Sequence, residues 1–104
     1  MKRLVVSEAA KTDLREIRVF SRKQWGREQA VAYVELMISR FARLMQNARR
    51  GARADHLILG LRRVNVRRHA ILYFEHADSI EILRVLHQQM DFAAQLGVER
   101  SDDR

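Results

Sequence analysis

Apolar residues recur at steps of three and four positions between Ala30 and Ala48, which is the spacing of one face of an amphipathic helix. The stripe consists of Ala30, Tyr33, Val34, Met37, Ile38, Phe41, Leu44, Met45 and Ala48. Similar spacing predicts an earlier helix from Glu8 to about Lys23, with Ser7 as its N-cap. Because only the short break Trp25-Gly26 separates them, we expect the two helices to form an antiparallel hairpin.

The pattern differs on either side of this hairpin. Leu4 to Ser7 reads as a short strand, and residues 47–60 read as a loop. Three strand-like runs follow, at Leu61–Val66, Ala70–Glu75 and Ile80–Leu86, with a tight turn at residues 76–79 between the last two. A short helical turn is expected from Met90 to Leu96.

These elements predict an α+β fold: a short N-terminal strand, an antiparallel helix hairpin and a three-stranded antiparallel sheet, with one sheet face left open. Strict alternation in the last strand would place Leu83, Val85 and His87 on one face, and Ile82, Arg84 and Leu86 on the other. We expect one domain over residues 1–97 and a flexible tail over residues 98–104.

The composition narrows the chemistry. The chain has 104 residues, of which 47% are apolar and 32% charged, as in ordinary globular proteins. It contains no cysteine, which excludes disulfides, thiolate metal sites and a cysteine nucleophile. The four histidines are too scattered to predict a metal site, and no cofactor is expected. Without a signal peptide or a membrane-spanning run, we expect a cytoplasmic protein.

Positive charge is concentrated in the second half of the chain. The formal net charge is +7, and residues 47–69 carry seven arginines against one acid, Asp55. Such a surplus favours an acidic partner, either nucleic acid or an acidic protein segment.

The run ILRVLHQQMD, residues 82–91, raises the question of catalysis. A metal-free RNA cleavage site needs a general base, a general acid and cations, and His69, His87 and the arginines could supply them. Alternatively, His87 is a hydrogen-bonded structural histidine at a strand end. Arg84, between apolar neighbours, requires an acid or solvent in either case.

Four segments carry a family resemblance, in the order SEAAKTDLREI (7–17), WGREQAVAY (25–33), GLRRVNVRRHAILYF (60–74) and IEILRVLHQQMD (80–91). Together they resemble the ParE branch of the RelE/ParE superfamily, the toxins of type II toxin–antitoxin systems. The resemblance extends from Ser7 to Leu96. It implies a non-enzymatic, cytoplasmic toxin that poisons DNA gyrase and is neutralised by an acidic, ParD-like antitoxin.

Two alternatives are a ribosome-dependent mRNA endonuclease of the RelE type and an inactive homologue that only binds its antitoxin. RelE-like nucleases carry lysines before the second strand, an inner-strand arginine and a C-terminal tyrosine or histidine. Here the loop holds arginines without lysine, His69 replaces that arginine, and the tail after Met90 has neither residue. We therefore expect no catalytic residue. The residues expected to bind gyrase or antitoxin are Arg62, Arg63, Arg67, Arg68, His69, Arg84 and His87.

Overall fold

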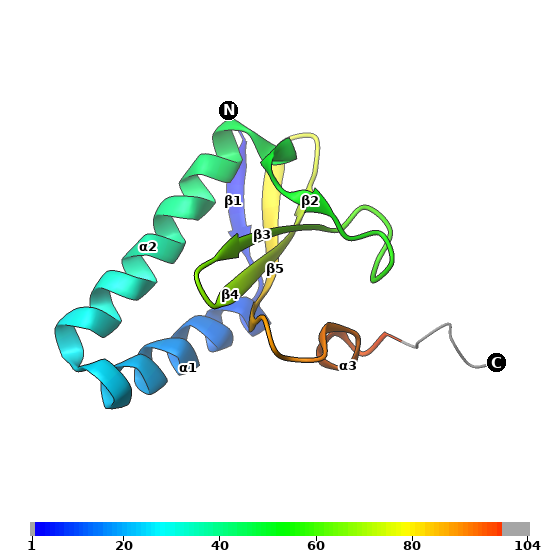
Figure 1. Ribbon diagram of the computed structural model, residues 1–104. Helices are drawn as coiled ribbons and strands as arrows, with labels where there is room; N and C mark the ends of the chain where they lie inside the picture. The colour runs from blue at the N-terminus through cyan, green and yellow to red at the C-terminus, as the bar shows by residue number, and fades with distance from the viewer. Residues whose placement is uncertain (1, 99–104) are drawn as a thin grey trace.

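The computed structural model describes residues 2–98, and the expected tail at residues 98–104 lies, apart from Val98, outside that range. Figure 1 shows a helix pair beside a twisted sheet. The elements in chain order are β1 (Arg3–Val6), α1 (Glu8–Trp25), α2 (Arg27–Gln46), the 3-10 helix η1 (Ala48–Arg50), β2 (Ala52–Arg53), β3 (Arg62–Val66), β4 (His69–Glu75), β5 (Ser79–His87) and α3 (Phe92–Leu96).

The expected α+β fold is confirmed, and the sheet is larger than its three predicted strands. Five strands lie in the order β1-β5-β4-β3-β2. β3, β4 and β5 are antiparallel neighbours, and β1 pairs in parallel with β5, from Arg3 opposite Ser79 to Val6 opposite Ile82. The N-terminal strand therefore makes the sheet mixed.

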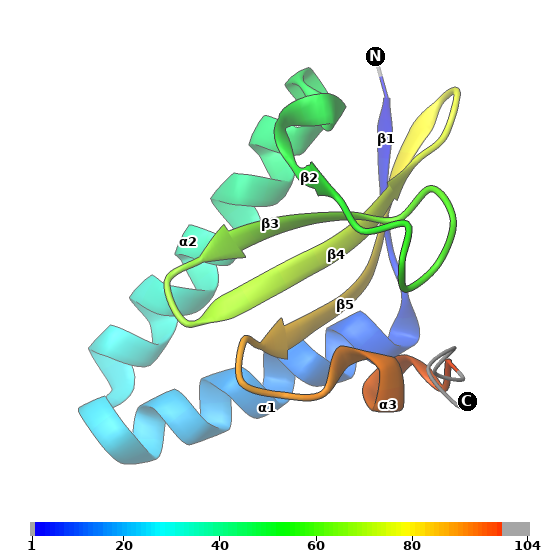
Figure 2. The ribbon, with the colours of Figure 1, turned by 45° about the vertical axis from the view of Figure 1, so that its right-hand side comes forward.

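Local signals set the helix ends. The Ser7 side chain accepts a hydrogen bond from the Ala10 N–H at 2.9 Å and caps α1, as expected. Gly26 separates α1 from α2 with a φ of +92°, a conformation that side chains with a Cβ rarely adopt. The two helices diverge from this glycine, and α1 lies alongside β5 (Figure 2).

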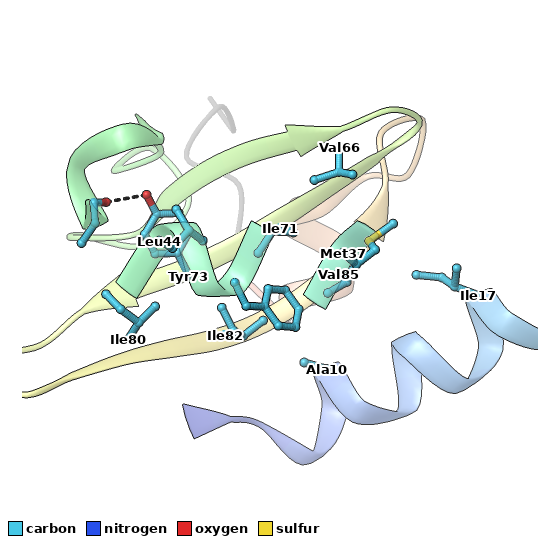
Figure 3. Close-up of a cluster of buried hydrophobic side chains, with 12 residues drawn as sticks. Ala10, Ile17, Met37, Leu44, Val66, Ile71, Tyr73, Ile80, Ile82 and Val85 are labelled. Atoms are coloured by element: carbon cyan, nitrogen blue, oxygen red, sulfur yellow. Dashed lines mark hydrogen bonds between the residues drawn. The ribbon is translucent and has the colours of Figure 1, made fainter. Parts of the chain in front are cut away.

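The core between the helices and the sheet uses most of the predicted stripe. Met37, Phe41 and Leu44 of α2 pack with Ile71, Tyr73, Ile80, Ile82 and Val85 of the sheet (Figure 3). The sequence also predicted Ile38 in this stripe. That prediction is wrong, because the Ile38 side chain is 51% exposed. At about 100° per residue, Ile38 points away from the side that Met37 buries.

Tyr73 connects this core to the segment after α2. Its hydroxyl donates to the Ala48 carbonyl at 2.6 Å (Figure 3). It also accepts a hydrogen bond from the Gly51 N–H at 2.9 Å. A Cβ on Gly51 would lie 2.5 Å from that hydroxyl and 2.8 Å from the Arg63 carbonyl oxygen. The backbone approaches so closely here that only glycine fits.

The predicted alternation along the last strand is wrong. Leu72 lies opposite Arg84 while Tyr73 lies opposite Ile82, so Leu83 is an extra residue in β5. A bulge of this kind shifts the alternation by one position. Ile82 consequently packs into the helix-side core together with Val85, whereas Leu83 packs with Leu86 on the other side.

The second sheet face is covered, in contrast to the open face expected from the sequence. Leu61, Ala70, Leu72, Leu86 and Phe92 form a second buried cluster, against which Leu57, Ile58 and Leu96 pack. The β2–β3 loop and α3 lie on the side of the sheet away from α2 (Figures 1 and 2). The segment predicted as a loop and the short helical turn predicted at Met90–Leu96 thus cover this face.

Candidate functional site

Two histidines meet where the sheet ends beside the helices. His69 begins β4 and lies directly opposite His87, the last residue of β5. Their rings are edge to face with centroids 5.3 Å apart. From α2, the Tyr33 hydroxyl is hydrogen-bonded to Nδ1 of His69 at 2.8 Å. Sequence reasoning selected both histidines and placed Tyr33 only in the core stripe.

The environment of His69 keeps its ring neutral. Burial, followed by the neighbouring His87, lowers the pKa of His69 to about 4, and the carboxylate of Asp13 opposes this only weakly. Burial also raises the pKa of Tyr33. His87 accepts the Gln89 N–H at its Nδ1, 3.1 Å away. His69 and Tyr33 are therefore both uncharged at neutral pH.

Arg84 has the acid that its position requires. Its Nε and Nη2 each donate to Asp13 of α1 at 2.8 Å, and its Nη1 donates to the Gln95 carbonyl at 3.0 Å. The hydrogen bond with Asp13 raises the pKa of Arg84. Asp13 is buried and also accepts the Val85 N–H at 2.9 Å. The guanidinium is thus held between α1, β5 and α3.

A groove of about 550 Å³ runs between α1 and this end of the sheet. Its polar lining includes Arg68, His69, Arg84 and His87. Its apolar lining includes Phe20, Trp25 and Met90, which are 58%, 50% and 47% exposed. Phe20 and Trp25 meet edge to face with centroids 6.4 Å apart. Large exposed apolar side chains gathered in one groove are typical of protein-binding surfaces.

The sequence prediction missed these three apolar residues. The predicted helix from Glu8 to about Lys23 includes Phe20, and the predicted break includes Trp25, but neither prediction assigns these side chains to a binding surface. A signal was available, because Val19 and Phe20 lie next to each other on a helix and cannot both face the same core. Met90 follows a polar strand end and carries no such signal.

The structure divides the seven predicted residues. Arg68, His69, Arg84 and His87 line the groove, and Arg67 joins Arg68 in an adjoining hollow against Trp25, Gln29, Ala32, Tyr33 and Leu36 of the helices. Arg67 and Arg68 form the tight turn between β3 and β4, which the sequence did not signal; Arg67 adopts a φ of +53°.

Arg62 and Arg63 lie elsewhere. Arg62 faces the helix side and donates to the Gly51 carbonyl at 2.7 Å. Arg63 faces the opposite side, where it donates to Asn65 and lies 4.8 Å from the Phe92 ring centroid. Both guanidinium groups bind within the fold rather than beside the groove.

Two other features bear on the kind of site. Within residues 2–98, no group of three histidine and acidic side chains is arranged to hold a metal ion. Over the same residues, no helix combines the length and apolarity needed to cross a membrane.

Comparison with known proteins now gives the family. The family model described as "ParE toxin of type II toxin-antitoxin system, parDE" matches residues 4–92. The chain is 34% identical over 97 residues to "Toxin ParE1" of Caulobacter vibrioides, covering 93% of this chain and 100% of that one. It is 32% identical over 90 residues to "Toxin ParE1" of Mycobacterium tuberculosis, covering 86% and 92%.

The fold has a solved counterpart. A chain in the structure titled "Chromosomal ParDE TA system from P. aeruginosa" superimposes with a TM-score of 0.74, at 24% sequence identity, over 84% of this chain and 96% of that one. At that identity the likeness concerns the fold alone. The family model and the two relatives, which extend over most of the chain, show that it belongs to the ParE toxin family of type II toxin–antitoxin systems.

Proposed function

We propose that this ParE family member poisons DNA gyrase without being an enzyme, blocks replication, and is neutralised in the cytoplasm by an acidic, ParD-like antitoxin. Family membership over residues 4–92 supports the toxin role. The solved ParDE system, named for both halves of the pair, supports an antitoxin partner. The gyrase target is what the family resemblance implies.

The proposal that the protein is not an enzyme rests on one observation. The polar side chains in the groove are hydrogen-bonded to other groups of the same protein. Arg84 is bonded to Asp13 and Gln95, His69 to Tyr33, and His87 to the backbone of Gln89. Acid–base cleavage of RNA needs a proton donor and a proton acceptor that are free to reach the substrate. The charge of Arg84 is already paired with Asp13, and His69, whose pKa is lowered to about 4, holds no proton to donate at neutral pH, so these groups are better suited to shaping a binding surface.

The groove also supports an acidic protein partner. It combines the apolar side chains of Phe20 and Trp25 with the exposed Arg68, on a protein of formal net charge +7. A negatively charged segment would be steered by this field and would bury its apolar side chains in the groove. Its association rate should fall as salt concentration rises, and an association rate that is independent of salt would contradict the steering.

The decisive experiment is a gyrase supercoiling and DNA-cleavage assay with purified protein, with and without its antitoxin. Trapped cleaved DNA that disappears on addition of antitoxin would establish the proposal. Charge reversal at Arg68 should weaken either antitoxin binding or gyrase inhibition, and charge reversal at Arg18, on α1, is the matched control.

No effect on gyrase would overturn the proposal and direct attention to the alternative, mRNA cleavage on the ribosome. That activity should then be lost in His69→Ala and His87→Ala. If neither activity is found but the antitoxin still binds, the chain is an inactive antitoxin-binding homologue.

A further inference from the structure

Arginine dominates the stretch between Glu35 and Glu75. It contains nine arginines, no lysine, and Asp55 as its one acid. Three of the nine are engaged: Arg53 with Asp55, Arg62 with the Gly51 carbonyl, and Arg63 with Asn65. The stretch therefore has far more guanidinium groups than the fold itself uses.

The other six define what we call the basic surface. Its members are Arg40, Arg43, Arg49, Arg50, Arg67 and Arg68. Within the part of the chain that the structure describes, none of these side chains makes a hydrogen bond or an ion pair. Arg67 and Arg68 lie beside α2, and Arg49 and Arg50 form most of η1, which continues from the end of α2 (Figures 1 and 2).

Helical spacing continues the basic surface along α2. Arg40 and Arg43 are three residues apart, and Arg40 is four residues after Leu36, which touches the hollow at Arg67 and Arg68. Residues spaced in this way share one side of a helix. η1 lies towards one end of β3 and the turn at the other, and a five-residue strand is roughly 16 Å long. The positive residues are thus spread along α2, η1 and the β3–β4 turn rather than gathered at one point.

The scarcity of exposed apolar side chains on the basic surface favours DNA over an acidic protein as its partner. Protein interfaces have an apolar centre, whereas DNA interfaces are polar and strongly positive. The exposed residues between Arg43 and Arg49 are Gln46 and Asn47, both polar. The apolar side chains of Phe20 and Met90 belong to the groove instead, and Trp25 lies between the groove and the hollow at Arg67 and Arg68. Guanidinium groups bind phosphate through two parallel hydrogen bonds, and every cation of this surface is a guanidinium.

We propose that the basic surface binds the phosphate backbone of duplex DNA without sequence preference. Its role rests on the proposed function: a toxin bound to gyrase would use this surface to hold the DNA on which gyrase acts. Of its six members only Arg68 also lines the groove, and the other five lie outside it, so the toxin could contact DNA and a protein at adjoining places. The binding itself can be measured without gyrase.

The test is fluorescence anisotropy of a labelled duplex of arbitrary sequence, titrated with the full-length protein at several salt concentrations. We compare Arg49→Gln/Arg50→Gln with Arg18→Gln/Arg22→Gln, which removes the same charge from exposed positions on α1. If each arginine neutralises one phosphate, the first variant should bind roughly tenfold or more weakly at about 0.1 M salt. The slope of the logarithm of the binding constant against the logarithm of salt concentration should become less steep by about 2. Both the loss of affinity and the change in slope should be much smaller for the control variant.

Equal losses in the two variants would overturn the proposal, because they would indicate general attraction by net charge. The absence of DNA binding would overturn it as well. A third contradicting result would be that polyglutamate displaces the DNA at a lower concentration of negative charge than unlabelled DNA does. That result would indicate an acidic protein as the ligand. Both variants alter exposed residues, and circular dichroism with thermal unfolding establishes that they are folded.

Repeating the gyrase cleavage assay with the same two variants separates the two proposals. One outcome is that Arg49→Gln/Arg50→Gln loses DNA binding, the control variant does not, and the wild type does not poison gyrase. That outcome would overturn the proposed function and support the DNA-binding surface. Poisoning that Arg49→Gln/Arg50→Gln leaves unchanged would overturn the role of the surface at gyrase.

Discussion

Asp13 and Arg84 lie 71 residues apart in the chain and form a bidentate ion pair. The pair lies at the edge of β5, beyond the point where its pairing with β1 ends. Asp13 also accepts the N–H of Val85, so one carboxylate replaces the strand that β5 lacks at this point. The pair orients Arg84 for the groove and fixes α1 on the sheet. A residue predicted to bind a partner is thus also part of the packing.

Asp13→Ala should be strongly destabilising. It leaves the Val85 N–H and the partly buried Arg84 guanidinium without their acceptor, which should lower the free energy of unfolding by about 2–4 kcal/mol. Urea denaturation measures this loss. Glu16→Ala, at an exposed position of the same helix, is the control and should change stability by less than about 0.5 kcal/mol. Equal stability of the two variants would contradict the role assigned to Asp13.

Tyr73→Phe removes the hydroxyl that joins the Ala48 carbonyl to the Gly51 N–H inside the core. We expect a loss of about 1–3 kcal/mol in the free energy of unfolding, since both backbone groups lose their partner. Thermal or urea unfolding measures it. Tyr33→Phe provides the comparison at a partly buried hydroxyl and should cost less; the reverse order would show that solvent satisfies the Ala48 and Gly51 groups.

The pKa of His69 predicts a dependence of stability on pH. Its folded value, about 4, lies below its ordinary value of 6.5, so the unfolded chain binds the proton more readily. The free energy of unfolding should therefore fall as pH decreases from 6.5 to 4, and should not depend on this group above 6.5. For a partly exposed ring we expect about 1–2 kcal/mol. His69→Gln should flatten this part of the profile relative to wild type, and an identical profile would exclude His69 as the cause.

His87→Ala tests whether this histidine is structural. The variant loses the acceptor of the Gln89 N–H and the ring contact with His69, so we expect a loss of about 1 kcal/mol in stability and gyrase inhibition close to wild type. Urea unfolding and the supercoiling assay together measure both properties. Unchanged stability with lost toxicity would identify His87 as a functional residue instead.

The sequence predicted the features that depend on local spacing. Ser7, Gly26 and the Met37–Phe41–Leu44 stripe mark both helices, because capping and helical periodicity act over a few residues. The family resemblance then predicted the fold as a whole. Charge and the family resemblance together selected Arg68, His69, Arg84 and His87 as predicted binding residues, and the structure places these four side chains in one groove.

The features that were missed depend on residues distant in the chain. No local signal marks Leu83 as the bulged residue, because the bulge exists only relative to β4. Arg67 and Arg68 contain none of the usual turn residues, and Arg67 adopts its positive φ because the strands on either side pair. Asp13 looks like any exposed helix acid until α1 packs against β5.

The parallel pairing of β1 with β5 has a consequence for synthesis of the chain. Arg3 leaves the ribosome early, and its partner Ser79 leaves only when α1, α2 and β4 have already been made. Contacts between such distant residues form slowly, and until they form the apolar side of α2 has no sheet to cover it. A translation product that stops after β4 lacks the strand that carries both Arg84 and His87. The groove therefore forms only after β5 and the residues that follow it have been synthesised.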